Sequence, residues 1–370
     1  MSLTKESVLS ALRNVMDPDL KKDLVTLNMI RDLEVEPKGG SVSVRVVLTT
    51  PACPLKKKIE DDVRAAIQSV SGVRMIQIKM DAEVRGKSAQ TPTQNSIPGV
   101  SHIIAVSSGK GGVGKSTVAV NLAVSLALEG ARVGLMDADV YGPNVPTMMG
   151  VTEQPKMMND PERGEVFFPP SAHGVKVMSM GFLVQADQPL VWRGPMLHSV
   201  VNQFCHKVEW GKLDYLVVDM PPGTGDVQLS LAQVVPITGT VLVSTPQEVS
   251  MQDVRKAFNM FEKVRVPVMG FVENMSYFKC DQCEKKHFPF GEDGGKVLSR
   301  KFNTELLAQL PMVTAVREGG DQGMPIVVRD AQSEVALSFR ELARKVAQKV
   351  SILAADGVDP SELVQIGKFN

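Results

Sequence analysis

The sequence predicts an α/β fold in two parts: a mostly parallel sheet with flanking helices, preceded by a small α/β domain. Three observations lead to this prediction. From residue 100 onward, apolar runs of strand length alternate with helical stretches, as in sheets that are buried on both faces. Before residue 85, a shorter set of strand and helix patterns stands alone. A polar stretch without periodicity separates the two parts.

The first domain is expected over residues 1–85. Apolar residues recur at helical spacing in residues 8–15, and strict alternation in residues 41–48 predicts a strand. A second helix is expected in residues 59–70, because its apolar residues again share one face. A further apolar alternation, in residues 73–80, completes this domain.

The second domain is expected over residues 100–350, after a linker at 86–99 and before a C-terminal tail at 351–370. Between residues 150 and 195, short strand-like pieces predict inserted hairpins, among them 166–168 and 175–178. The strands of the main sheet are predicted at residues 103–107, 133–137, 213–219, 240–245 and 268–272.

Composition limits the classes of function. Apolar residues make up 43% of the chain and charged residues 22%, which is typical of a globular protein. Lys plus Arg equals Asp plus Glu at 41 each, so we expect neither a nucleic-acid nor a membrane partner. The first twenty residues contain no apolar run of signal-peptide length, and four cysteines are too few for a disulfide framework. We therefore expect a cytoplasmic protein.

A glycine-rich loop follows the first strand of the second domain and leads into a helical run at residues 118–128. Strand, glycine loop and helix come in the order that a phosphate-binding loop requires. The glycines let successive backbone N–H groups turn inward, and the helix N-terminus adds partial positive charge. The pattern predicts a P-loop NTPase whose nucleotide contacts are Gly109, Gly111, Gly112, Val113, Gly114, Lys115, Ser116 and Thr117.

Charged residues around this loop predict its chemistry. Lys115 is expected to meet the β- and γ-phosphates, and the Ser116 hydroxyl to ligate Mg²⁺. Three aspartates end or follow strands whose carboxyl ends face the ligand crevice. Asp219 is expected to hold Mg²⁺ directly or through water, Asp137 to support the metal site, and Asp139 to orient the attacking water.

Two cysteines, Cys280 and Cys283, are separated by two residues in a polar loop with three lysines and His287. Two thiolates at this spacing can ligate one metal centre, and nearby cations lower the pKa of a thiol. A tetrahedral zinc ion or a four-iron cluster requires four ligands, so such a centre needs two chains. Spacing alone leaves a cluster, a zinc ion completed by His287 and a redox dithiol equally open.

The other two cysteines have different surroundings. Cys53 stands between two prolines at the start of a helix, where it is either a thiol of low pKa or a small buried side chain. Cys205 lies on an apparent helix and is expected in the core.

The second lysine of the loop, Lys110, is a mark of the deviant Walker A class that includes MinD, ParA and nitrogenase iron protein. That resemblance implies that Lys110 reaches across a homodimer to the partner's phosphates and acts like an arginine finger. More specific motifs, at residues 109–146, 192–196, 219–226, 273–276 and 280–283, closely resemble the Mrp/ApbC family of iron–sulfur cluster carriers.

The resemblance covers residues 100–350 and implies a function. It implies an ATPase that binds and slowly hydrolyses ATP with Mg²⁺, and holds a [4Fe-4S] cluster across a homodimer through Cys280 and Cys283. Apo iron–sulfur proteins would receive the cluster, and scaffold proteins are further expected partners. Coupling would run through the segments after Asp139 and Asp219, and Asn274 matches the position that contacts adenine.

The first domain resembles the small N-terminal domain of many bacterial Mrp proteins and of iron–sulfur assembly factors. This likeness makes Cys53 a candidate contact for a second cluster or a target. It supports the same function for the whole chain.

Two other functions fit a P-loop ATPase. A spatial organiser of the ParA or MinD kind would cycle on DNA or membrane and would show a basic patch or a basic amphipathic C-terminal helix. We expect the basic residues of the helix-like stretch 335–350 to lie instead on a mixed solvated face. A metal-insertion chaperone for nickel or molybdenum is the third alternative.

Overall fold

The structure is a computed structural model that describes residues 3–84, 96–183, 194–280 and 282–355. Most of the predicted linker lies outside the described residues, as do Trp192 and Arg193 of the family motif and the last part of the predicted tail. In the described part of the chain, no helix has both the length and the apolar character needed to cross a membrane.

The chain divides into two compact units, residues 1–85 with 347–357 and residues 86–346 with 358–370. The predicted tail differs from the structure at its start, because helix α11 (Glu334–Ala355) continues through residue 350 without a break. The physical reason is local. Residues 351–355 contain neither glycine nor proline, so nothing in them ends a helix.

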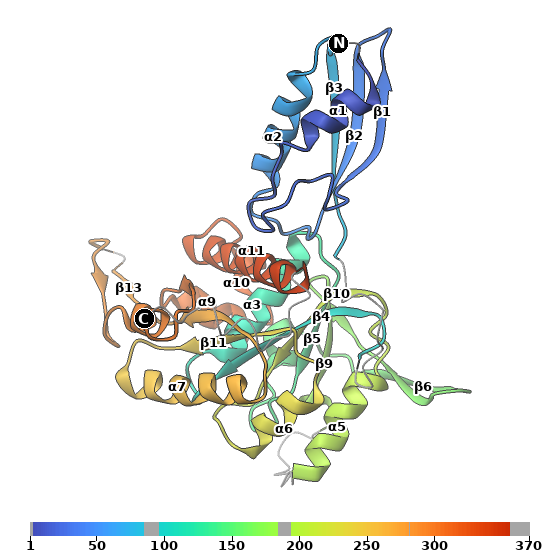
Figure 1. Cartoon of the computed structure of the whole chain (residues 1–370). Coiled ribbons are helices and arrows are strands. Elements are labelled where there is room, and N and C mark those ends of the chain that lie inside the picture. The colour runs from blue at the N-terminus through green and yellow to red at the C-terminus, as the bar shows by residue number, and fades with distance from the viewer. Residues whose placement is uncertain (1–2, 85–95, 184–193, 281, 356–370) are drawn as a thin grey trace. The chain divides into compact units, whose positions relative to one another are not determined.

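The first unit is a three-stranded sheet with two helices (Figure 1). Strand β1 pairs antiparallel with β2, and β2 pairs parallel with β3. The alternation in β2 buries Val42, Val44 and Val46 in the core of this unit, as a strand period of two predicts. The elements are α1 (Lys5–Leu12), β1 (Ile30–Glu36), β2 (Ser41–Leu48), α2 (Lys56–Gln68) and β3 (Met75–Ala82).

The helices of this unit bury apolar residues at helical spacing. Helix α2 turns Ile59, Val63 and Ile67 inward, four residues apart, and each is almost completely buried. Helix α1 begins with a capping box in which Ser7 N donates to Thr4 Oγ1 and Thr4 N donates to Ser7 Oγ. The buried apolar residues of these helices and strands form a core that belongs to the first unit.

The second unit confirms the predicted fold class. Its central sheet has eight strands within the described residues, in the order β15-β12-β11-β4-β10-β5-β9-β8, and only β8 is antiparallel to its neighbour. Five strands match the predicted apolar runs: β4 (Val100–Ser108), β5 (Val133–Asp137), β10 (Leu213–Asp219), β11 (Gly239–Ser244) and β12 (Val268–Glu273).

Both predicted hairpins form, but one of them belongs to the central sheet and not to an insertion. The piece at 175–178 belongs to β9 (Val175–Ser179), which pairs parallel with β5 inside the central sheet. Its Val175 and Val177 are fully buried, so the strand is a core element and not part of an insertion. The piece at 166–168 forms a hairpin apart from the central sheet, whereas β9 forms its hairpin with the preceding strand at the edge of that sheet. The remaining strands are β6 (Lys156–Asp160) and β7 (Gly164–Phe168) in that hairpin, and β8 (Ser171–Ala172) and β15 (Leu306–Gln309) in the central sheet.

Helices cover both faces of the central sheet, with α3 and α11 on one side and α5, α6 and α7 on the other (Figure 1). A large buried cluster that includes Met136, Phe204 and Trp210 forms much of the core. The helices are α3 (Lys115–Leu128), α4 (Val145–Met149), α5 (Gly194–His206), α6 (Asp226–Val234), α7 (Glu248–Lys263), α8 (Gly294–Phe302), α9 (Thr314–Asp321), α10 (Ile326–Arg329) and α11, with a 3₁₀ turn at Met180–Phe182.

Candidate nucleotide site and cysteine hairpin

The glycine loop connects the end of β4 to the start of α3, as predicted. Gly112 and Gly114 have φ values of 80° and 81°, in the left-handed region that disfavours other residues. A Cβ atom on Gly114 would collide with the side-chain amide of Asn274, and one on Gly109 would collide with the backbone of α7 at Asp253. The loop conformation therefore requires glycine for two reasons, backbone geometry and close packing.

Lys115 lies at the centre of the site and is buried together with two carboxylates. Its Nζ is 2.6 Å from Asp219 Oδ1 and 3.3 Å from Asp139 Oδ2. Burial disfavours the charged ammonium, but the attraction of Asp219 and Asp139 outweighs it and raises the pKa of Lys115. The lysine therefore carries a positive charge where the phosphates of a nucleotide are predicted to bind.

Asp219 ends β10 and is completely buried. Burial raises the pKa of its carboxyl group, although the contact with Lys115 acts in the opposite direction. Within the described residues, Asp219 Oδ2 is buried and accepts no hydrogen bond of normal geometry. A carboxylate oxygen without a partner and the hydroxyl of Ser116 are hard ligands of the kind that Mg²⁺ prefers. These residues fit the predicted metal site.

Asp137 and Asp219 both end strands, as the sequence predicts, and the structure shows that these strands are neighbours with the two residues in register. Asp137 Oδ2 accepts hydrogen bonds from Ser179 Oγ at 2.7 Å and from Val145 N at 3.3 Å. Burial, reinforced by the charge of Asp219, raises the pKa of Asp137 to about 8. Asp137 thus holds the start of α4 close to the nucleotide loop.

The two oxygens of the Asp139 carboxylate make different contacts. Its Oδ1 accepts from the backbone N–H groups of Tyr141 and Gly142, at 3.1 and 3.3 Å, while Oδ2 contacts Lys115. The first set of bonds is a turn contact of the kind that aspartate makes with its own chain. The second brings Asp139 beside the predicted phosphate position, and its role toward water stays a prediction.

Lys110 points to a different neighbour from Lys115. Its Nζ donates a long hydrogen bond of 3.4 Å to Gln247 Oε1, at the start of α7. The next residue, Gly111, has open space where a Cβ atom would lie. Ser116 Oγ accepts from Lys115 Nζ at 3.3 Å, and Thr117 lies on the wall of an adjacent cavity.

That cavity has a volume of about 520 Å³ and lies beside the start of α3. Asn274 lines it and also donates from Nδ2 to the carbonyl oxygen of Val113, at 2.9 Å. Asn274 thus supports the loop backbone, and its predicted contact with adenine stays a prediction. Met312 and Arg317 complete the walls. No motif marks these two residues in the sequence.

Glu273 is a buried residue whose role the sequence does not indicate. Its carboxylate accepts from Ser276 Oγ at 2.5 Å and from Gln309 Nε2 at 2.8 Å, and it also contacts the backbone N–H of Gly295. A carboxylate with this many donors is held firmly. Glu273 therefore fixes the loop that carries Asn274.

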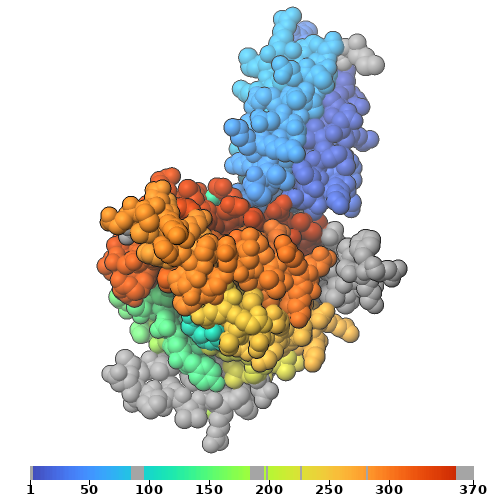
Figure 2. Space-filling view, turned by 90° about the vertical axis from the view of Figure 1, so that its left-hand side faces the viewer, coloured from blue at the N-terminus to red at the C-terminus, as the bar shows by residue number. Residues whose placement is uncertain are grey.

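Cys280 and Cys283 lie on a short hairpin formed by β13 (Phe278–Lys279) and β14 (Lys286–His287). The hairpin is closed by a hydrogen bond from Cys280 N to Lys285 O, at 3.0 Å. Figure 1 shows that it extends outward from its unit, and the orange surface of Figure 2, which contains it, is on the outside. Cys283 is exposed and Cys280 is half-buried, so both thiols are at least partly accessible to a second molecule.

The part of the chain that the structure describes contains no zinc site built on the cysteine pair. Across the described ranges, no group of three or more His, Cys, Asp and Glu side chains could hold a metal ion. His287 therefore does not complete a three-ligand site with Cys280 and Cys283. Among the described residues, no further ligand joins the cysteine pair.

The prediction that Cys205 belongs to the core is confirmed, since the residue is 1% exposed.

Of the two interpretations of Cys53, the one as a thiol of low pKa is wrong. Burial raises the pKa of Cys53 from its ordinary 9.0 to about 11, because the half-buried thiolate loses hydration. The loss of hydration outweighs the favourable effect of the backbone near the start of α2.

This shift predicts slow alkylation of Cys53. At pH 8, iodoacetamide should modify Cys53 about a hundredfold more slowly in the folded protein than in urea, since only the thiolate reacts. The rate in the folded protein should rise about tenfold per pH unit up to about pH 11. Peptide mapping by mass spectrometry measures both rates, and equal rates in the two states would contradict the shift.

Strand, glycine loop, buried lysine and strand-end aspartates together define a P-loop NTPase, and Lys110 gives it the deviant Walker A pattern. Comparison with known families agrees. Residues 99–347 match the family described as NUBPL iron-transfer P-loop NTPase, and residues 5–80 match the iron-sulfur cluster assembly protein family. The chain belongs to the NUBPL iron-transfer P-loop NTPase family.

Similar proteins extend over nearly the whole chain. An "Iron-sulfur cluster carrier protein" from Synechocystis is 50% identical over 353 residues, which is 95% of this chain and 99% of the relative. A protein of the same name from Deinococcus radiodurans is 49% identical, over 94% of this chain and 96% of its own. The resemblance inferred from the motifs is confirmed.

A solved structure is similar to the second unit. The nucleotide-binding protein from Archaeoglobus fulgidus, determined in complex with ADP, is 37% identical and has a TM-score of 0.56. The match covers 64% of this chain and 91% of that protein. The cell-division ATPase MinD from Pyrococcus furiosus, 24% identical with a TM-score of 0.50 over 66% of this chain and 98% of its own, shares the fold.

Proposed function

We propose that this protein is an iron–sulfur cluster carrier that binds and slowly hydrolyses ATP. A homodimer holds one [4Fe-4S] cluster between two pairs of Cys280 and Cys283, and the dimer transfers the cluster to apo-proteins. The observation that carries the proposal is the hairpin, which presents the cysteine pair at the surface of a nucleotide-binding unit. The names of the relatives give the same cargo.

The number of thiols supports a shared cluster. A [4Fe-4S] cluster takes four cysteine ligands, and one hairpin supplies two. A homodimer with closed symmetry brings identical hairpins together and doubles the ligand set. In the same dimer, Lys110 of each chain would reach its partner's nucleotide, as the deviant Walker A pattern implies.

The buried site supports the nucleotide chemistry. When ATP binds, Lys115 would exchange its contacts with Asp219 and Asp139 for the β- and γ-phosphates. The carboxylates released in this way are then available, Asp219 to Mg²⁺ and Asp139 to the attacking water, while Asp137 supports the metal site. The cavity beside Asn274 and Thr117 would take the base.

Ion pairs on α11 weigh against a spatial organiser on DNA or membrane. Arg340 and Arg344 both contact Glu129 Oε1 at 2.9 Å, and Lys345 is 3.2 Å from Glu341. Two acids therefore offset part of the charge of these three bases, and the charge around them is mixed. They do not form the basic face that such a protein needs.

Anaerobic reconstitution with iron and sulfide tests the proposal. The wild type should gain a broad absorbance band near roughly 400 nm and about four irons per dimer, because two cysteine pairs hold one cluster. The variant Cys280→Ala/Cys283→Ala should lose the band, while Cys205→Ala, which changes a buried core cysteine, should keep it. Absorbance, metal and sulfide content, and oligomeric state are measured.

Each alternative gives a different result. Bound zinc without sulfide would indicate a zinc site, and selective binding of nickel or molybdenum would indicate a metal-insertion chaperone. A cluster that forms equally well in the double variant would contradict the role of the hairpin.

A further inference from the structure

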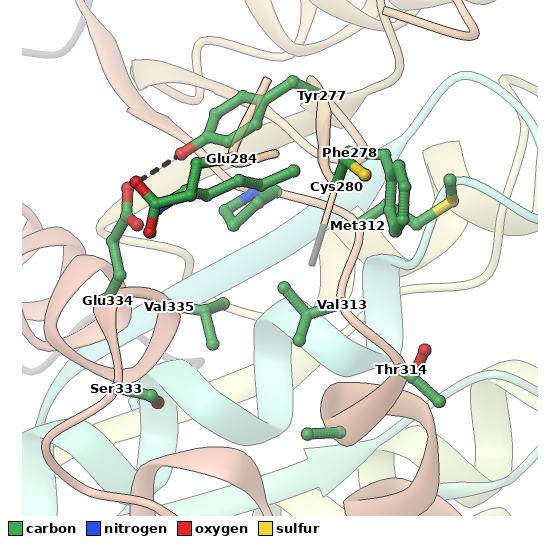
Figure 3. A pocket seen from close by; sticks show the side chains of 13 residues that line it. Tyr277, Phe278, Cys280, Glu284, Met312, Val313, Thr314, Ser333, Glu334 and Val335 are labelled. Carbon is green, nitrogen blue, oxygen red and sulfur yellow. Dashed lines mark hydrogen bonds and ion pairs between the residues drawn. The ribbon is translucent and has the colours of Figure 1, made fainter. Parts of the chain in front are cut away.

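Two cavities of the second unit share one wall. The cavity beside the nucleotide loop adjoins a second cavity, of about 510 Å³, that reaches the cysteine hairpin at Cys280. Pro311, Met312 and Val313 line both. Figure 3 shows Met312 and Val313 on the side of the second cavity, with Met312 near Cys280 and Phe278. A shift of this segment in response to a bound base would therefore change the surroundings of the thiol.

Backbone hydrogen bonds tie the shared wall to the chain that leads into the hairpin. Leu310 N donates to Glu273 O at 2.8 Å, Ser276 N to Leu310 O at 2.9 Å, and Met312 N to Tyr277 O at 2.7 Å. The segment 273–277 begins beside Asn274, which holds the nucleotide loop, and ends one residue before the hairpin. The two segments are thus fastened together along their length.

Tyr277 is the residue in which these contacts meet. Its hydroxyl donates to Glu334 Oε1 at 3.1 Å, at the start of α11 (Figure 3). The Lys286 ammonium lies 4.0 Å from the centre of its ring. Burial, followed by the bond to Glu334, raises the pKa of Tyr277 to about 12, so the hydroxyl remains a donor at physiological pH. Tyr277 therefore joins the shared wall, strand β14 of the hairpin and α11.

Resting on the proposed function, we infer that Tyr277 is a positioning residue that transmits nucleotide binding to Cys280 and Cys283. The path runs from Asn274 and the shared wall, 311–313, through Tyr277 to the hairpin. It differs from the path expected from the sequence, which follows the segments after Asp139 and Asp219. The bond to Glu334 gives the hairpin a fixed support on α11, against which a movement of the wall can act.

The test measures thiol reactivity in reduced, metal-free protein. Short exposures to iodoacetamide, with and without Mg²⁺ and a non-hydrolysable ATP analogue, give alkylation rates for Cys280 and Cys283 by peptide mapping. In the wild type the analogue should change the Cys280 rate by about fivefold or more, the lower end of ordinary coupling between sites. In Tyr277→Phe and Glu334→Ala the change should fall to about twofold or less, because each variant removes the same hydrogen bond.

Two controls make the result specific. Glu341→Ala removes a carboxylate from the exposed face of the same helix and should keep the wild-type response. The double variant Tyr277→Phe/Glu334→Ala should respond like either single variant, since partners in one bond are not additive.

An unchanged Cys280 rate in the wild type would overturn the inference, as would a full response in both single variants. Loss of the response in Glu341→Ala would also overturn it, because the effect would then belong to α11 in general. The assay contains no iron. A failure to bind a cluster would therefore contradict the proposed function while the coupling result stands by itself.

Discussion

Lys115→Met is expected to abolish ATP hydrolysis and, separately, to destabilise the nucleotide-free protein. Lys115 supplies the positive charge that the transferred phosphoryl group requires, so single-turnover hydrolysis should fall about a hundredfold or more. The same change leaves the buried carboxylates of Asp219 and Asp139 without their cation. Removing one partner of a buried pair typically lowers the free energy of unfolding by about 3 kcal/mol.

A second substitution separates the two effects. In Lys115→Met/Asp219→Asn the more deeply buried of the two carboxylates is neutral, so most of the lost free energy of unfolding should return while hydrolysis stays absent. Chemical denaturation at pH 7.5 without nucleotide measures the stability. If the double variant is as unstable as the single one, packing of the lysine stem and not charge explains the loss. Hydrolysis within about tenfold of wild type would place Lys115 outside the phosphate site.

Residue pattern accounts for the strands that meet at the nucleotide loop. Strand β10 is an unbroken apolar run, and such a run between turn signals predicts a strand buried on both faces. Its last residue, Asp219, stands out because an acid at the end of an apolar strand has few structural explanations. The glycines of the loop are predictable for the same reason, since φ values near 80° restrict the choice of residue.

Other elements carry weaker local signals. Strand β9 contains Lys176, whose Nζ donates to the carbonyl oxygen of Trp210 at 2.7 Å. A polar residue therefore interrupts the apolar pattern of this strand, although the strand is buried. Strand β1 has a register shift between Arg31 and Glu34, which breaks the alternation. Strand β15 is only four residues long. Pairing of these strands depends on distant partners, which local pattern does not contain.

The residues of the site also differ in whether the sequence alone identifies them. Lys115, Ser116 and Asp219 could be assigned from the sequence because phosphate and Mg²⁺ chemistry restrict residue type. Met312 and Tyr277 could not, since many residue types can form a wall or support a hairpin. For Cys53 the local context suggested a low pKa, but burial by residues elsewhere in the first unit dominates.

Lys110→Ala is expected to reduce hydrolysis by roughly a thousandfold, as loss of an arginine finger does, while nucleotide binding is kept. The side chain of Lys110 makes only a long contact with Gln247 and lies beside the open space at Gly111. This geometry leaves the ammonium able to leave its own chain and reach a partner's phosphates. Asp139→Asn should also be inactive, because it removes the carboxylate that is predicted to orient the attacking water in the site of its own chain.

Mixing these two inactive variants distinguishes action in trans from action in cis. A mixed dimer contains one complete site, formed by Asp139 of the Lys110→Ala chain and Lys110 of the Asp139→Asn chain. Random pairing makes about half of the dimers mixed, each with one of two sites complete, so about a quarter of wild-type activity should return. If Lys110 acts in its own chain, every site lacks one group and mixing restores nothing. Steady-state ATP hydrolysis, measured against the mixing ratio, therefore decides whether the nucleotide site is complete only in the dimer, and with it whether one assembly step serves both ATP and a shared cluster.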